Sequence, residues 1–566
     1  MPEHRPQDLS ELELGFARQH AVRWLSPRVL VGTGVRVLLA TIFGSYADKR
    51  ELQAVLPSTV HHHDDGDELW FDFVADVGDG FDATYSVASL LAAPSLDVDR
   101  IPLPRGRLLV LGGDEVYPVA SARGYEDRTK GPYRAALPEP PPDQPTLYAL
   151  PGNHDWYDGL TAFLRLFTQQ RPIGGWATEQ TRSYFAAQLP QRWWLFAVDA
   201  QLSSYIDAPQ LAYFREAAQQ LRPGDAVLLC WPTPAWAHTD RDPGDYDPID
   251  FFDREIIRPT GASIRVMLSG DAHHYARYES DDDGPTAQRI TCGTGGAYLV
   301  ATHRLPEQVE LPSPRSRMRR QTPTRPFSLR ARYPDRFASR WLTPGILGVG
   351  WRNPGFVALL GALQAVFMVS LIFAIDYGRR LGGGWSSLQT LRASLPALLI
   401  AVLILYAGVG FARIDPRSPR RTALVAGLLH GLAQIGLGIA WTASVLALHR
   451  RHWMPDAALA VIDVVVTVAV IGAVATLLAG SYLALASQFD VNLNEAFAGQ
   501  SIEDYKGFLR LHIGRDGALT IYPIKIPRIC RRWRADPEGA PGTPWLLPAE
   551  PLRTELIEDP IVVPRN

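Results

Sequence analysis

Residues 146–156 read TLYALPGNHDW, a short apolar run that ends in a polar loop containing glycine. Apolar runs of four to eight residues are typical of buried strands. The loop places Asn153, His154 and Asp155 directly after this strand. Such a position suits binding or catalysis, because the strand holds the loop in place while the loop reaches solvent.

The same pattern of an apolar run followed by polar side chains recurs along the first half of the chain. Asp76 follows FDFVA, and Asp114 follows LLVLGG with Tyr117 three residues later. Asp271 and His273 follow VMLSG. Strands that lie side by side in a sheet would bring these groups together. Asp, Asn and His are suitable ligands for a hard or borderline cation, so the pattern predicts a metal site.

These motifs resemble those of the calcineurin-like metallophosphoesterase superfamily, and more closely those of the purple acid phosphatases. They read ADVG, GDEVY, GNHD, CWP and GDAHHYAR in this chain. The resemblance covers residues 66–303, which is under half of the chain. It implies an α/β (α+β) four-layer metallophosphoesterase sandwich with two metal ions at the ends of the sheets.

The resemblance implies a metal-binding role for five residues. Asp76, Tyr117 and His273 would bind the first metal. Asp114 would bridge the two metals, and Asn153 would bind the second. One or two ions of Mn, Fe or Zn are expected at these positions.

The resemblance also implies the chemistry of the site. His154 would contact the substrate phosphate, stabilise its charge and help to protonate the leaving oxygen. Asp155 would orient His154. A hydroxide held by the metals would attack the phosphorus in line, without a covalent enzyme intermediate.

The second metal site departs from the family pattern at two positions. Cys230 stands in VLLCWPTP and Asp271 in GDAHH, where the family has histidines. Three interpretations remain open. The second metal binds through Asp271 and the Cys230 thiolate; or the site holds a single metal with weakened activity; or the domain binds a phosphate compound without turning it over.

The motif RITCGTGGAYL places Gly293, Gly295 and Gly296 close together. Glycines in such a loop would allow the backbone to approach a phosphate. A tight turn explains them equally well. The sequence leaves both interpretations open.

The second half of the chain is much more apolar than the first. Nearly unbroken apolar stretches cover residues 356–375, 393–412, 423–448 and 457–486. About 20 apolar residues are enough for a helix to cross a membrane. Four buried helices of a soluble bundle would each show a polar face, and these stretches do not. The sequence therefore predicts an all-α unit of four transmembrane helices.

Arginines in the short flanks favour one orientation of these spans. The start of the chain, MPEHRPQDLSELELGF, is polar and acidic, so no cleaved secretory signal is expected. Three cysteines in 566 residues suit a reducing compartment. Both termini and the catalytic domain are therefore expected in the cytoplasm, at a bacterial inner or plasma membrane. The arginines on the flanks assigned to the cytoplasm are Arg315, Arg317, Arg319, Arg320, Arg340, Arg352, Arg413, Arg417, Arg420, Arg421, Arg528, Arg531, Arg532 and Arg534.

The remaining regions are predicted as smaller pieces. Residues 1–65 form an N-terminal segment, whose apolar part at 22–46 is either a helix on the membrane surface or a core helix. Residues 304–353 are rich in Pro and Arg and are expected to form a linker. Residues 488–566 are expected to be a small tail with two strands around an Arg-Asp-Gly turn.

Taken together, these features predict a membrane-anchored, metal-dependent phosphoesterase. Its partners would be the lipid bilayer and a phosphate mono- or diester, which the membrane anchor suggests is lipid-linked. The net charge of -3 gives no broad basic surface for nucleic acid. A rival prediction is a catalytically weak sensor or scaffold that binds a phosphorylated ligand.

Overall fold

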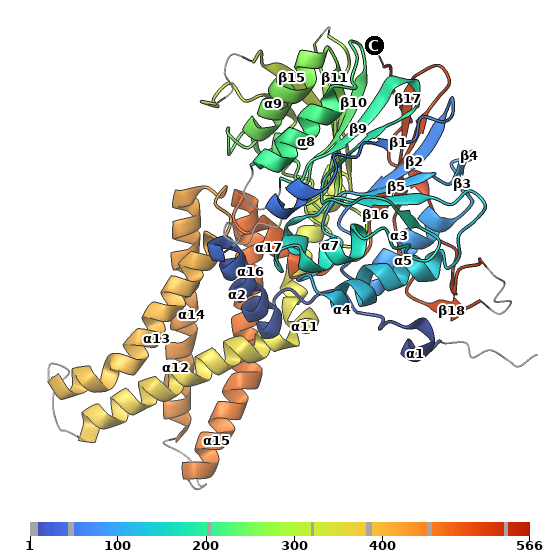
Figure 1. Ribbon diagram of the computed structural model, residues 1–566. Helices are drawn as coiled ribbons and strands as arrows, with labels where there is room; N and C mark the ends of the chain where they lie inside the picture. The colour runs from blue at the N-terminus through green and yellow to red at the C-terminus, as the bar shows by residue number, and fades with distance from the viewer. Residues whose placement is uncertain are drawn as a thin grey trace, which may run out of the picture. The chain divides into compact units, whose positions relative to one another are not determined.

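The computed structural model (Figure 1) describes residues 9–43, 50–200, 205–282, 284–318, 322–380, 388–449, 456–536 and 542–565. The chain divides into two compact units. The first comprises Met1–Val22, Gly32–Ser339 and Ile502–Asn566, and the second comprises Arg23–Val31 and Arg340–Ser501.

Two large sheets form the first unit within the described part of the chain. The eight-stranded sheet has the order β20 (Glu555–Leu556), β17 (Leu519–Ile526), β16 (Lys506–Ile513), β2 (Leu69–Val74), β5 (Leu108–Leu111), β6 (Thr146–Ala149) and β7 (Ala177–Thr178), with β21 (Ile561–Val563) also paired to β17. The nine-stranded sheet has the order β1 (His61–His62), β8 (Phe185–Gln188), β9 (Trp193–Ala197), β10 (Ala226–Cys230), β11 (Ser263–Ser269), β13 (Gln288–Cys292), β12 (Tyr275–Ser280), β15 (Arg325–Tyr333) and β14 (Gln308–Leu311).

Alternation along the strands explains why the two sheets stack. In β2, Phe71 and Phe73 point into an apolar layer that also contains Leu195 and Leu268 of the other sheet. Val74 of the same strand points to the opposite face. Successive side chains of a strand face opposite sides, so each sheet has one face for its partner sheet and one for helices.

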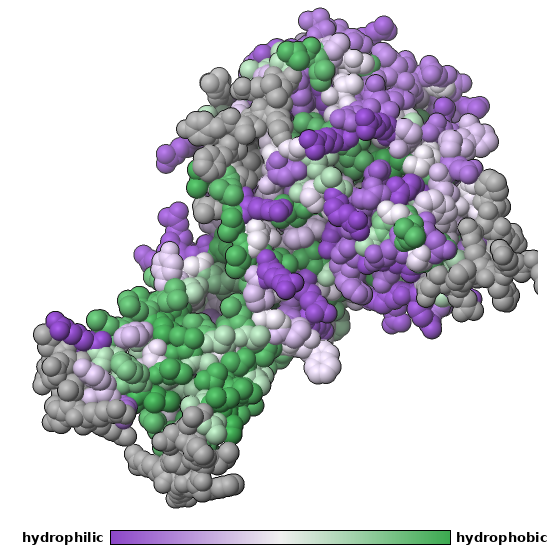
Figure 2. Space-filling model, turned by 60° about the horizontal axis from the view of Figure 1, so that its bottom comes forward, coloured by the Kyte–Doolittle hydropathy of each residue, from purple (hydrophilic) through white to green (hydrophobic). Residues whose placement is uncertain are grey.

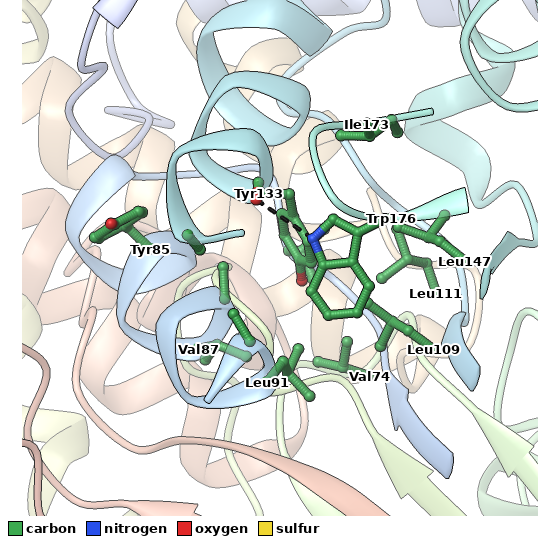
Figure 3. Packing of buried hydrophobic residues seen from close by; sticks show 14 of the residues in the cluster. Val74, Tyr85, Val87, Leu91, Leu109, Leu111, Tyr133, Leu147, Ile173 and Trp176 are labelled. Atoms are coloured by element: carbon green, nitrogen blue, oxygen red, sulfur yellow. Dashed lines mark hydrogen bonds between the residues drawn. The ribbon is translucent and has the colours of Figure 1, made fainter. Parts of the chain in front are cut away.

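Helices cover the outer faces of both sheets. The eight-stranded sheet is covered by α3 (Phe81–Ala92), α5 (Gly131–Ala136) and α7 (Thr161–Phe167), and the nine-stranded sheet by α8 (Ala208–Ala218) and α9 (Asp247–Phe252). Figure 3 shows the first of these cores, where the indole of Trp176 bonds the carbonyl oxygen of Tyr133 at 3.3 Å. The predicted mixed α/β unit is therefore confirmed, and its sheets and helices form four layers.

The boundaries of this unit differ from the predicted ones. Residues 304–353 were expected to be a linker, but they contribute β14 and β15 to the nine-stranded sheet, followed by α10 (Arg336–Leu342). Residues 488–566 were expected to be a separate tail, but β16 and β17 form the hairpin that extends the eight-stranded sheet beside β2. β15 pairs with both β12 and β14, so pairing within the sheet outweighs the Pro- and Arg-rich composition of residues 304–353.

A buried ion pair fixes the C-terminal hairpin to the sheet. Arg510 of β16 lies opposite Asp72 of β2 and donates to both carboxylate oxygens, at 2.8 and 3.0 Å. A third guanidinium bond reaches the carbonyl oxygen of Leu103 at 3.1 Å. Both charged side chains are almost wholly buried. Fork-to-fork pairing of this kind is specific in geometry, so it defines the register of β16 on β2.

The second unit contains the apolar helices. They are α12 (Pro354–Arg380), α13 (Leu388–Ala412), α14 (Arg420–His449) and a fourth, continuous helix made of α15 (Asp456–Val466), a π-helical turn at Thr467–Ile471 and α16 (Gly472–Ala486). Each contains a segment long and apolar enough to cross a membrane. Apolar residues cover their exposed surface, whereas the first unit is largely hydrophilic (Figure 2). The prediction of four such helices is confirmed.

Small and polar residues hold these helices together. A Cβ on Gly408 would stand 2.8 Å from the carbonyl oxygen of Gly427, so α13 and α14 approach backbone to backbone. Gln364 donates to the side chain of Gln434 at 3.2 Å, and Gln434 donates to the Ala475 carbonyl at 2.9 Å. Close glycine contacts and interhelical hydrogen bonds are typical of packing between membrane helices.

The N-terminal segment contains α2 (Pro27–Phe43) within the region predicted as either a surface or a core helix. Its side chains Val31, Val35 and Ile42 are exposed. A core helix would bury these groups, so their exposure argues against the core-helix interpretation.

Candidate metal centre

The polar strand ends of the eight-stranded sheet lie at one edge. β2, β5 and β6 are parallel neighbours, so their carboxyl ends point the same way. Asp76 follows β2, Asp114 follows β5, and Asn153 begins the short helix after β6. His273 follows β11 of the other sheet. The structure therefore brings together residues that are far apart in the sequence.

Tyr117 lies at the centre of this group. Its hydroxyl is 2.7 Å from Asp76 Oδ1, 3.3 Å from Asp114 Oδ2 and 3.0 Å from His273 Nε2. His273 Nε2 is also 3.4 Å from Asp76 Oδ1. All four side chains are buried. The predicted set Asp76, Asp114, Tyr117 and His273 is thus in mutual contact, and we call it the strand-end cluster.

The ring of His273 is held in one orientation. Its Nδ1 lies 2.9 Å from the carbonyl oxygen of Tyr298. A carbonyl only accepts, so Nδ1 carries a proton, and Nε2 is directed at the strand-end cluster. Imidazoles that ligate metals commonly have their other nitrogen fixed in this way.

The backbone of three aspartates adopts an uncommon conformation. Asp76, Asp114 and Asp271 have φ values of 61°, 56° and 66°. Non-glycine residues adopt this left-handed region rarely, although Asp is among those that enter it most readily. Such outliers concentrate at binding and catalytic sites. Each one turns a carboxylate away from the direction that its strand would otherwise give it.

Glycines make room for two of these carboxylates. A Cβ on Gly152 would stand 2.1 Å from Asp114 Oδ1, and one on Gly293 would stand 2.3 Å from Asp76 Oδ2. A Cβ on Gly296 would meet the Val77 carbonyl oxygen at 1.8 Å. The CGTGG glycines therefore pack against the loop that carries Asp76.

The donors and acceptors of the strand-end cluster do not balance. With Asp114 ionised and the proton of His273 on Nδ1, the side chains of Asp76, Asp114 and His273 all accept, and the Tyr117 hydroxyl has a single proton to give. Among the described residues, Asp76 Oδ2 and the Asn153 side-chain oxygen are buried without a hydrogen-bond partner. Buried acceptors without donors are costly, and a cation satisfies several at once. This donor set fits one metal ion.

The pKa of Asp114 is also raised by its buried, carboxylate-rich surroundings. Burial raises the pKa of Asp114 well above its ordinary value, and the carboxylates of Asp76, Asp155 and Asp271 raise it further. Crowded buried carboxylates favour protonation because their charges repel. A bound cation would reverse this balance. The effect also places Asp271 electrostatically close to Asp114.

His154 and Asp155 lie beside the strand-end cluster but have separate partners. The backbone N–H of His154 donates to Asp114 Oδ1 at 2.9 Å, and its Nδ1 is 2.7 Å from the carbonyl oxygen of Pro118. Burial lowers the pKa of His154 to about 4. The ring is therefore neutral at pH 7, with the proton on Nδ1 and Nε2 as the acceptor.

Asp155 does not make the contact predicted for it. Its Oδ2 accepts from the backbone N–H groups of Gly152, at 2.8 Å, and Glu115, at 3.3 Å, while Oδ1 accepts from Tyr125. The expected orientation of His154 by Asp155 is thus replaced by the Pro118 carbonyl. Asp155 instead ties together the loops that follow β5 and β6.

Cys230, a predicted ligand of the second metal, lies in an apolar layer. It is the last residue of β10, and its side chain shares the inner apolar layer with Leu228 and Cys292. Burial raises the pKa of the Cys230 thiol. A metal ligand must be the thiolate, so this buried thiol would have to lose its proton to coordinate a metal. Asp114, Asn153 and Asp271 are the other residues predicted for the second metal site.

As they stand, no three His, Cys, Asp or Glu side chains in the described segments are spaced to hold a metal ion. The hydroxyl of Tyr117 lies between these side chains, within hydrogen-bond distance of each. Coordination therefore requires these side chains to exchange their hydrogen bonds for metal bonds, with small adjustments.

Comparisons with known proteins give limited information. No family model and no curated protein match the chain. One similar solved structure is GAP50, the anchor in the inner membrane complex of Plasmodium, at 11% identity over 48% of this chain and 92% of that chain, with a TM-score of 0.30. Another is a purple acid phosphatase from yellow lupin (Lupinus luteus) seeds, at 10% identity over 43% of this chain and 46% of that chain, with a TM-score of 0.27. Similarities this low assign neither family nor function.

Proposed function

We propose that the chain is a membrane-anchored, metal-dependent hydrolase of phosphate mono- or diesters. The observation that carries this proposal is the contact of the Tyr117 hydroxyl with Asp76, Asp114 and His273. Four potential ligands from two sheets meet at the strand ends, in a buried place where their acceptors exceed their donors. A structural core has no need of such an arrangement.

The strand-end cluster would hold one ion of Mn, Fe or Zn, with Asn153 near it. When bound, the ion would supply positive charge that polarises a phosphoryl oxygen and lowers the pKa of water. The positive φ angles and the glycine contacts hold the ligand side chains in place before the metal binds. Preorganised ligands of this kind lose little freedom on binding.

His154 would act on the substrate rather than on the metal. Its Nε2 is an acceptor in the neutral ring, because Nδ1 donates to the Pro118 carbonyl. A phosphate anion beside the ring would raise the pKa of His154, since an opposite charge favours the protonated form. The imidazolium could then pass that proton to the leaving oxygen. Substrate binding would thus prepare the acid.

A second candidate function is binding of a phosphorylated ligand without turnover. The position of Cys230 in the apolar layer favours it, because it removes one of the ligands expected for the second ion. Loss of one ion removes charge stabilisation that phosphoryl transfer depends on. The two functions differ in turnover and share ligand binding.

The anchor suggests where the substrate lies. We propose that the four apolar helices of the second unit span the membrane, that α2 lies on its surface, and that both termini and the first unit are cytoplasmic. A hydrolase held at a bilayer meets lipid-linked or membrane-proximal phosphoesters at high effective concentration. A lipid-linked phosphoester is therefore the proposed substrate class.

The test uses the purified full chain in detergent. Metal content is measured first, and hydrolysis of an aryl phosphate and its diester is then followed with Mn²⁺, Fe²⁺ or Zn²⁺. Asp114→Asn should lose the metal and at least about 100-fold in rate, which corresponds to several kcal/mol of charge stabilisation. Asp97→Asn, on the exposed β3 strand (Ser95–Val98), is the matched control and should retain both.

The outcomes separate the two candidates. Turnover that Asp114→Asn abolishes supports the hydrolase. Metal binding without turnover under any of the three ions supports the binding protein. Turnover that survives Asp114→Asn, or a protein that binds no metal, contradicts the proposed site.

A further inference from the structure

A large cavity lies in the C-terminal part of the first unit. It has a volume of about 680 Å³ and is lined by residues of two segments, 527–532 and 550–555. Cavities of about 300–1,000 Å³ are the usual size for small-molecule sites. None of the residues of the strand-end cluster lines it.

Two short ladders create this cavity by pairing the same two segments on either side of it. β17 pairs with β20, which places Lys525 opposite Glu555. β18 (Trp533–Ala535) pairs with β19 (Leu546–Pro548), and the Ala549 N–H continues this pairing to the Arg532 carbonyl at 2.8 Å. Between the ladders the segments separate. The cavity is thus a built feature, fixed by hydrogen bonds at both ends.

Arginine supplies most of the charge on its walls. Arg528, Arg531, Arg532 and Arg553 line the cavity, against the carboxylates of Glu550 and Glu555. We call this feature the arginine pocket. Guanidinium groups are charged at all accessible pH values, so the pocket is permanently cationic.

Both carboxylates are already neutralised. Glu550 accepts from Arg532, and Glu555 is 3.0 Å from Lys525. Arg531 is also paired, with Asp504 at 3.0 Å. Asp504 additionally accepts from the Ile529 N–H at 3.1 Å, which fixes the segment that begins the pocket.

Two arginines remain uncompensated. No carboxylate in the described part of the chain lies within ion-pair distance of Arg528 or Arg553, and both side chains are exposed. They come from the two different segments that form the walls. Their charges are therefore available to a ligand that enters between the walls.

We propose that the arginine pocket binds a phosphate-bearing anion. A guanidinium fork matches two oxygens of one phosphate, and a tetrahedral phosphate presents oxygens to both walls at once. A carboxylate presents its two oxygens in a single plane and satisfies one wall. The anion is either a free phosphate compound or the headgroup of an anionic lipid, and both carry the same recognised group.

The proposal is tested by calorimetric titration of the full chain in detergent. The probes are inorganic phosphate, short-chain phosphatidic acid and, as a zwitterionic reference, short-chain phosphatidylcholine. The variants are Arg528→Gln, Arg553→Gln and their combination. The matched control is Arg515→Gln, an arginine 74% exposed on the turn between β16 and β17.

Each substitution in the pocket should raise Kd at least about tenfold, and the pair about 100-fold, because each removes a charge-assisted hydrogen bond. Arg515→Gln should leave Kd unchanged. Arg528 and Arg553 lie outside the strand-end cluster. Any phosphate bound at the strand-end cluster would therefore keep its affinity in these variants. This separates the two sites.

Equal binding of inorganic phosphate and phosphatidic acid would identify a free phosphate compound, and binding of phosphatidic acid alone would identify a lipid headgroup. The proposal is overturned if the wild type binds neither probe. It is equally overturned if the double variant, with an unchanged circular dichroism spectrum, binds as tightly as the wild type. If the double variant does not fold, the two single variants decide by the same criterion.

Discussion

Replacing Arg510 by Met should specifically loosen the C-terminal hairpin from the first unit. The substitution keeps an unbranched side chain of similar length and removes three hydrogen bonds, two to Asp72 and one to the Leu103 carbonyl. Asp72 would then be a buried carboxylate without its partner. Breaking a buried pair in this way costs about 3–5 kcal/mol.

Hydrogen exchange measures this loss where it occurs. The amides of β16 that bond β2 should exchange about 140- to 4,000-fold faster in Arg510→Met, because each 1.4 kcal/mol is a factor of ten. Arg515→Met on the adjacent exposed turn should change exchange by about twofold or less. Peptide-resolved mass spectrometry of the full chain in detergent provides the comparison.

Two further results belong to the same argument. Asp72→Leu combined with Arg510→Met should recover most of the loss, because two apolar side chains leave no unpaired charge. The single variant should also be less impaired at pH 5 than at pH 8, because an isolated buried carboxylate takes up a proton as the pH falls. Exchange in Arg510→Met within tenfold of the wild type would show that the pair does not anchor β16, and the reasoning would fail.

Three other predictions follow from the described contacts. Gly152→Ala should destabilise the chain by about 1–3 kcal/mol and abolish metal binding, because its Cβ would stand 2.1 Å from Asp114 Oδ1. The control is Gly66→Ala, whose Cβ would meet nothing nearer than 3.5 Å. Equal metal content in the two variants would contradict the prediction. Burial lowers the pKa of Lys506 from 10.5 to about 8. Between pH 8 and 10.5 the unfolded chain therefore binds more protons than the folded chain, and the free energy of unfolding should rise with pH by up to about 3 kcal/mol. Melting temperatures measured over a pH series test this. The same rise in Lys506→Met would exclude Lys506 as the cause of the rise. The three native cysteines are buried, so in the variant Arg515→Cys an impermeant maleimide should label the introduced thiol. Labelling only after cell lysis fits a cytoplasmic first unit. Labelling in intact cells would contradict the proposed topology.

The strand ends could be predicted from the sequence because their signal is local. An apolar run followed by Asp, Asn or His identifies both the strand and the side chains at its end, and Asp76, Asp114, Tyr117 and His273 do meet in the structure. The apolar helices were equally clear, because their length and uniform hydropathy need no knowledge of distant residues.

Other features depend on contacts that no local pattern reveals. The Pro118 and Tyr298 carbonyls that orient the two histidines are backbone groups, which every residue possesses. Cys230 was assigned to the metal from its place in a motif, yet alternation with Leu228 in AVLLC already indicated the same inward face. Attention to that period of two would have placed the thiol in the apolar layer.

The two strands of the C-terminal hairpin were predicted, but their place in the eight-stranded sheet could not be. β16 pairs with β2 across a sequence separation of 438 residues at Arg510 and Asp72. Alternation within β16 predicts a strand, but it cannot identify the partner strand. A tail of two strands and a continuation of the main sheet therefore look alike in the sequence.

That long separation has a consequence for biosynthesis. The helices of the second unit lie between β15 and β16 in the chain, so all of them are translated before the eight-stranded sheet can be completed. At about 5–20 residues per second, β2 waits on the order of 20–90 s for its neighbour to leave the ribosome. During that interval the edge of β2 is open, and the nascent chain has time to enter the membrane. The first unit can therefore be completed only after all the helices between β15 and β16 have been translated.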